Sequence, residues 1–130
     1  MQDNFRRSTL TLPLPAPLAA ANGVVTYTSP RPQRIASAQL CLSDTGTGAG
    51  STEVKVKVNG IAITAAGDLA IVGAAAGKSI SKDITLGSNQ FPGGARINEG
   101  DVITLDVVSV PATTVPKASF VVLDIVEVDI

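Results

Sequence analysis

The sequence has no histidine, no tryptophan and a single cysteine. Histidine is the commonest general base, the usual partner of a catalytic serine or cysteine, and the commonest transition-metal ligand. With one cysteine, no disulfide can form within the chain, and Cys41 lies in an alternating apolar run where a small buried hydrophobe is expected. The composition therefore argues against an enzyme, and we expect no catalytic residue, no cofactor and no metal site.

Aromatic side chains and excess charge are also scarce. The four aromatic residues are Phe5, Tyr27, Phe91 and Phe120, too few for a surface that stacks on sugars or bases. The net charge is −1, without the basic excess of a nucleic-acid-binding protein. No apolar run approaches the ~20 residues that span a bilayer. We expect a soluble protein with neither nucleic acid nor membrane as a partner.

Prolines determine the character of the N-terminal segment. Residues 8–30 carry no charge and hold four of the eight prolines. Three of these alternate within residues 13–17, which excludes a helix and a central strand. We therefore predict an extended arm over residues 1–22 and a folded domain over residues 23–130. The arm would lie across its own domain or a neighbouring subunit, and its predicted partner-binding residues are Arg6, Arg7, Leu10, Leu12, Leu14 and Leu18.

The rest of the chain is typical of short antiparallel strands. Glu53–Val58 alternates strictly, and Asn59-Gly60 then supplies a two-residue hairpin turn before Ile61–Thr64. Such short strands need two sheets to enclose a core. We predict an all-β antiparallel sandwich, either a jelly roll or an immunoglobulin-like domain, without a helix. The predicted strands cover residues 24–28, 34–42, 53–58, 61–64, 68–72, 78–86, 101–110 and 119–130.

The last predicted strand is apolar on both faces. A strand of this kind is normally covered on both sides. A subunit interface would cover the second face, and we assign self-association to Phe120, Val122, Val126 and Val128. The N-terminal arm and packing at a sheet edge are the alternatives.

Charge is unevenly placed along the chain. Residues 1–43 hold four arginines and one aspartate, whereas residues 99–130 hold six acidic residues and one lysine. The basic front and the acidic tail could complement each other across a subunit contact. Scattered surface charge is the alternative.

Three local patterns resemble chemical sites but fit a structural role better. Gly73–Ser79 is similar to a phosphate-binding loop, yet three residues rather than four separate its glycines, and a strand is expected after it. Asp106 and Asp124 would face each other if the last two strands pair, but the aromatic lining of a glycosidase cleft is missing. Asp44 and Glu99–Asp101 could bind calcium, although neither segment has the density of acids of a dedicated site.

Four segments carry a family resemblance. They are Pro32–Leu40, the alternating strand that ends Val58-Asn-Gly60, Ile97–Val107 and Ala118–Val126. Together they resemble the small β-sandwich domains of tailed-bacteriophage capsid decoration (cement) proteins and head-fibre proteins. The resemblance implies a non-enzymatic virion protein that binds the major capsid protein on the outside of an assembled shell and stabilises it, as a homotrimer. It also implies synthesis in the host cytoplasm and an extended arm that clamps neighbouring subunits on the capsid surface.

Two other functions stay open. A carbohydrate- or receptor-binding module of a phage fibre or tail would share the sandwich fold, because one fold hosts many functions. The shortage of aromatic residues counts against this alternative. A tail-tube or connector protein would also oligomerise through β-structure, but into rings or tubes rather than trimers.

Overall fold

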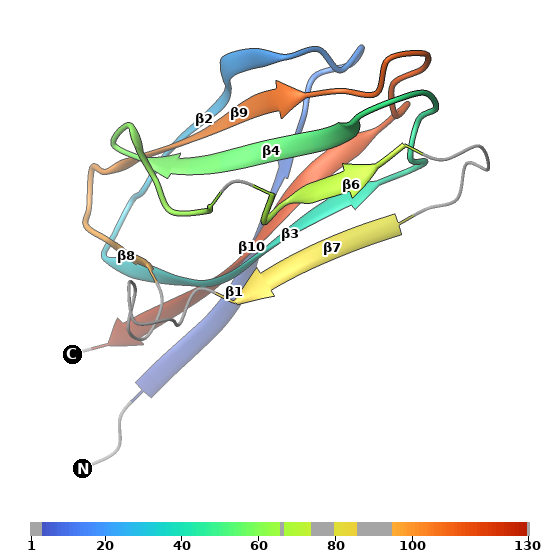
Figure 1. Cartoon of the computed structure of the whole chain (residues 1–130). Helices are drawn as coiled ribbons and strands as arrows, with labels where there is room; N and C mark the ends of the chain where they lie inside the picture. Colours follow the sequence, from blue (N-terminus) through green and yellow to red (C-terminus); the bar gives the residue numbers. More distant parts are fainter. Residues whose placement is uncertain (1–3, 66, 74–79, 86–94, 130) are drawn as a thin grey trace.

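Two antiparallel sheets face each other in the computed structural model, which describes residues 4–65, 67–73, 80–85 and 95–129 (Figure 1). Within these residues the chain forms strands and turns, and no helix is present that could cross a membrane. The predicted all-β sandwich is confirmed.

Within the described residues each sheet contains five strands. Sheet A has the order β1-β10-β3-β7, with β8 also paired to β3. Its strands are β1 (Asn4–Pro13), β10 (Ser119–Asp129), β3 (Gln33–Leu42), β7 (Ile80–Thr85) and β8 (Ala95–Ile97). Sheet B has the order β2-β9-β4-β5, with β6 also paired to β4. Its strands are β2 (Ala21–Thr28), β9 (Val102–Ser109), β4 (Ser51–Val58), β5 (Ile61–Ala62) and β6 (Ala70–Val72).

The connectivity is that of a jelly roll. The long strands alternate between the two sheets along the chain, and the first strand pairs with the last. This order decides between the two strand arrangements that the sequence left open. Jelly rolls occur in viral capsid proteins, lectins and cupins, so the fold by itself does not determine a function.

Alternation along the strands builds the core between the sheets. In β4, Val54 and Val56 are buried, whereas Lys55 and Lys57 point to the outer face of sheet B. The same period of two buries Leu105 in β9. Because few aromatic residues are present, the core consists of aliphatic side chains: Leu12, Leu14, Leu18, Ile35, Ala38, Leu40, Leu42, Val54, Val56, Ile63, Leu69, Ile71, Ile97, Ile103, Leu105, Val107, Val121, Leu123 and Ile125.

The N-terminal segment differs from the predicted separate arm. Residues 4–13 form β1, which pairs with β10 without a break from Asn4 opposite Asp129 to Pro13 opposite Phe120. The segment thus lies across its own domain, the first of the two predicted alternatives, and the sandwich begins before residue 22. The physical reason is that only Pro13 falls within β1, at its end, where an edge strand tolerates it.

The predicted hairpin is present but short on its return side. Asn59 and Gly60 take positive φ angles of 51° and 82°, as a tight hairpin turn requires. Strand β5 then covers two residues only, since the side chain of Thr64 accepts a hydrogen bond from the Val56 amide at 3.1 Å. The predicted strands at 24–28, 34–42, 101–110 and 119–130 agree with β2, β3, β9 and β10 within a few residues.

Two strands, β1 and β8, were not predicted. The predicted strand at 68–72 is shorter in the structure, as β6, and the described part of the predicted strand at 78–86 forms β7. Residues 74–79, which make up most of the phosphate-loop-like segment Gly73–Ser79, lie outside the described residues.

Candidate interaction surface

The outward side of β10 forms an apolar row on sheet A. Val121, Leu123 and Ile125 point inward and are at most 2% exposed. The alternate residues Phe120, Val122, Asp124 and Val126 point outward, so one carboxylate stands between the two valines. Phe120 is 37% exposed, and the other three side chains are partly buried. We name Phe120, Val122 and Val126 the β10 outer row.

The surroundings of this row are uncharged at one end. Phe120 lies in register between Pro13 of β1 and Cys41 of β3. Its neighbour along the row, Val122, lies between Thr11 and Gln39. Pro13 and Thr11 are exposed. The outer face of sheet A therefore combines an exposed aromatic ring, a valine and uncharged neighbours from both adjacent strands.

Cys41 belongs to this outward face and is half-buried. Burial raises the pKa of its thiol, so the thiolate that reacts with electrophiles is less populated than in a free cysteine. The predicted buried core position is wrong, because the alternation of β3 directs Leu40 and Leu42 into the core and Cys41 to the outer face.

The predicted self-association residues all lie in β10. Phe120, Val122 and Val126 share the outer face, so the structure brings these three together. Val128 lies in the same strand, opposite Phe5 of β1, but its side chain is outside the described part of the chain. Whether the row contacts a second subunit stays a prediction.

The predicted partner-binding leucines are placed differently from the expectation. Leu12, Leu14 and Leu18 are 7%, 7% and 4% exposed and belong to the chain's own core, while Leu10 is partly buried against it. Their side chains could anchor a partner only if β1 left the sheet. Their burial follows from the Leu-Thr-Leu alternation, which directs the leucines to one face once β1 pairs with β10.

Arg6 and Arg7 lie in β1 opposite Glu127 and Val126 of β10. The side chains of the two arginines are outside the described residues. The backbone register nevertheless places the basic front beside the acidic tail within one sheet. No subunit contact is needed to bring the two ends together.

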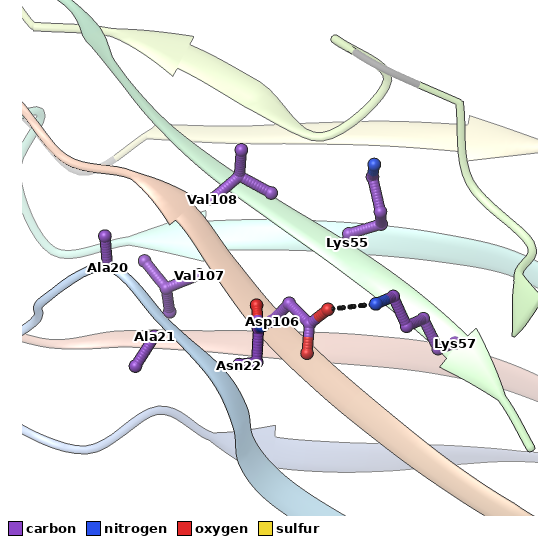
Figure 2. Close-up of a pocket in the computed structure, with 8 residues that line it drawn as sticks. All are labelled: Ala20, Ala21, Asn22, Lys55, Lys57, Asp106, Val107 and Val108. Atoms are coloured by element: carbon purple, nitrogen blue, oxygen red, sulfur yellow. Dashed lines mark ion pairs between the residues drawn. The ribbon is translucent and has the colours of Figure 1, made fainter. Parts of the chain in front are cut away.

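A second feature, a pocket on the outer face of sheet B, was not predicted (Figure 2). Its volume is about 470 Å³, and it is lined by Ala20, Ala21, Asn22, Lys55, Lys57, Asp106, Val107 and Val108. Asp106 is only 5% exposed. One of its oxygens lies 2.6 Å from Lys57 Nζ, and the other accepts a hydrogen bond from the Gly23 amide at 2.7 Å.

The Asp106 carboxylate of β9 stabilises the position of β2 within sheet B. The pairing of β2 with β9 shifts between Ala21 and Val25, and Gly23, with a φ of 64°, turns its amide toward the carboxylate at this bulge. Burial raises the pKa of Asp106. The hydrogen bonds from Lys57 and Gly23 and the charges of Lys57 and Lys55 lower it by more, so the net shift is downward. A carboxyl group held ionised in this way is a poor proton donor at neutral pH.

The two carboxylates considered as a catalytic pair are far from facing each other. Asp106 lies on the outer face of sheet B and Asp124 in sheet A, and β9 and β10 do not pair. The condition for the glycosidase alternative is therefore not met, because consecutive long strands of a jelly roll belong to opposite sheets.

The two predicted loop acids have structural partners. The Asp44 carboxylate accepts hydrogen bonds from the amides of Gly46 and Lys117, which lower its pKa. Gly100, with a φ of 87°, forms a turn in which Asp101 accepts a hydrogen bond from the Asn98 amide. Among the described residues, no three acidic, histidine or cysteine side chains gather in a group suited to a metal ion.

Comparison with known proteins finds distant structural likenesses. No protein-family model matches the chain, and no curated protein is significantly similar to it in sequence. A chain from the capsid of Ralstonia phage GP4 is similar in structure over 97% of this chain and 84% of its own, with 17% identity and a TM-score of 0.42. The catalytic unit of a thermostable GH87 α-1,3-glucanase from Streptomyces thermodiastaticus strain HF3-3 is similar over 94% of this chain and 25% of its own, with 17% identity and a TM-score of 0.35. Likenesses this weak do not discriminate between functions.

Proposed function

We propose that this chain is a structural virion protein that attaches to the outside of an assembled phage capsid, contacts the major capsid protein and stabilises the shell. The observation that supports the proposal is the β10 outer row. Phe120, 37% exposed, and two partly exposed valines stand on the solvent side of a sheet whose other side already forms the core. Exposed apolar side chains gathered on the outer face of a sheet are typical of an association surface.

The rest of the surface suits attachment better than chemistry. Lys57 and the Gly23 amide hold the buried Asp106 carboxylate in its ionised form, so it has no proton to donate. Sheet A supports the β10 outer row rigidly, because β10 is hydrogen-bonded to β1 on one side and to β3 on the other. A rigid, preformed apolar face loses little entropy when it binds.

The test uses capsid shells of the phage that encodes the chain. Purified protein is mixed with shells and the bound fraction is measured after sedimentation. We expect saturable binding, and we expect V122T and F120S to weaken it about tenfold or more, because each removes apolar area from the contact.

A matched control separates this face from the opposite one. Val108 is 45% exposed and lines the pocket on the outer face of sheet B, so V108T makes the same chemical change on the other side of the sandwich. V108T should bind shells like the wild type. Absence of binding by the folded wild type, or equal loss with V122T and V108T, would contradict the proposal.

The two alternatives give different results in the same preparation. A carbohydrate- or receptor-binding module would bind glycans on an array and leave shells unoccupied. A tail-tube or connector protein would form rings or tubes visible by electron microscopy in the absence of shells.

A further inference from the structure

The four edges of the two sheets are not protected alike. Natural sheets guard their edges with very short strands, charged side chains, prolines, bulges or inward-pointing charges, because an unguarded edge pairs with other strands. In sheet B, one edge is formed by β5 and β6, which have two and three residues. The opposite edge, β2, carries the bulge between Ala21 and Val25. Both edges of sheet B are therefore guarded.

The β7 edge of sheet A is guarded by a charge. Lys82 lies opposite Leu40, a core residue, so it occupies an inward register position. Its ammonium group donates a hydrogen bond to the Gly67 carbonyl at 2.9 Å. An incoming strand at this edge would have to bury that charge.

The β1 edge has none of these devices between Ser8 and Leu12, and Arg7 and Pro13 flank this stretch. The strand has ten residues and pairs with β10 without any register shift. From Ser8 to Pro13 it carries no charge, and in the described part of the chain no strand lies on its other side. Figure 1 shows β1 as a long, regular strand beside β10.

The direction of the free backbone groups follows from one hydrogen bond. The Leu14 amide donates to the Ser119 carbonyl at 3.0 Å. In an antiparallel ladder the residues that bond to one neighbour alternate with those that face away. Leu12, Leu10 and Ser8 therefore bond to β10, whereas Thr9 and Thr11 direct their N–H and C=O groups to the open edge.

From this edge we infer that two copies of the chain associate by pairing β1 with β1 in antiparallel fashion, so that the two A sheets become continuous. A register centred on Leu10 places Thr9 opposite Thr11 of the partner subunit, and the two residues exchange backbone hydrogen bonds. The partly buried Leu10 then packs against Leu10 of the partner subunit on the core side.

The distribution of charge along β1 favours a second copy of this chain as the partner at this edge. Antiparallel pairing about Leu10 places Arg7 opposite Pro13 of the partner subunit, so no arginine faces another across the contact. Each copy contributes the same uncharged stretch, and the contact is self-complementary, as a two-fold interface requires. The contact closes at two subunits, whereas the resemblance to decoration proteins implies three. The inference does not depend on attachment to a capsid.

Light scattering on the full chain over a dilution series tests the inference. We expect a dimer. T11P should raise the dimer dissociation constant about tenfold or more, because proline removes an edge N–H that makes no bond within the chain. T11V keeps this N–H and should leave the constant unchanged.

A charge pair tests the register itself. T9K/T11K places lysines opposite each other across the contact and should give monomers, whereas T9K/T11E places Lys opposite Glu at both positions and should restore the dimer. Circular dichroism confirms that each variant is folded, and the charge variants decide the matter if T11P does not fold. A monomeric or trimeric wild type, or a dimer that survives both T11P and T9K/T11K, would overturn the inference.

Discussion

Strand β1 should be indispensable for folding, and the substitution L12A measures this. Leu12 is 7% exposed and belongs to the core. Replacing a buried leucine by alanine costs about 2–5 kcal/mol, and we expect the lower part of this range, about 2–3 kcal/mol, because Leu12 lies in an edge strand that can relax around the space. With a urea dependence of about 1–3 kcal/mol per M, the unfolding midpoint should fall by roughly 1 M.

Removal of residues 1–18 should have a far larger effect than L12A. It deletes three core leucines, Leu12, Leu14 and Leu18, and leaves β10 without one of its two neighbours. The summed cost approaches or exceeds the ~5–15 kcal/mol by which a domain of this size is stable. We expect the truncated chain to be unfolded or aggregated.

Urea unfolding followed by far-ultraviolet circular dichroism suits this chain, which lacks tryptophan. T11A is the matched control, since Thr11 is the exposed neighbour of Leu12 in the same strand, and it should shift the midpoint much less. The reasoning fails if L12A and T11A have the same midpoint, or if the chain without residues 1–18 unfolds cooperatively near the wild-type midpoint.

Two further predictions concern the turns and the buried ion pair. D106N should lower the free energy of unfolding by about 1–3 kcal/mol, because it weakens the bonds to Lys57 and Gly23. The native pKa of Asp106 lies below its ordinary value, so its contribution is present above the unfolded-state pKa of about 4 and is lost as the pH falls through the native pKa. Urea midpoints of wild type and D106N should therefore converge below about pH 4, and a difference that persists undiminished there would contradict the assignment. G48A should destabilise the protein more than G60A. Both glycines have positive φ angles, 103° at Gly48 and 82° at Gly60. A Cβ on Gly48 would lie 2.5 Å from the Thr113 amide nitrogen, whereas a Cβ on Gly60 would meet nothing within 4 Å. Equal melting temperatures of the two variants would refute this account of the Gly48 contact.

Local signals in the sequence were sufficient for much of the fold. The alternation of Glu53–Val58 and the Asn59-Gly60 pair report on neighbouring residues only, and both were interpreted correctly. The sheet order was not predictable in this way, because the pairing of β1 with β10 joins residues at opposite ends of the chain. The prolines after Pro13 also masked the Leu-Thr-Leu alternation that precedes them.

The candidate surface was only partly readable from the sequence. The double apolar face of residues 119–130 led to Phe120, Val122 and Val126, and these residues do share the outer face of sheet A. The leucines of the N-terminal segment look identical as partner anchors and as core residues, so their burial could be learned only from the structure. The Asp106 pocket depends on a bulge in β2, for which the only sequence signal is Gly23.

Electron cryo-microscopy of shells incubated with the protein tests the central claim most directly. The account predicts ordered density on the outer surface of the shell, in which the β10 outer row faces the capsid protein and the sheet B pocket faces solvent. Bare shells, or density in which sheet B faces the capsid, would contradict it.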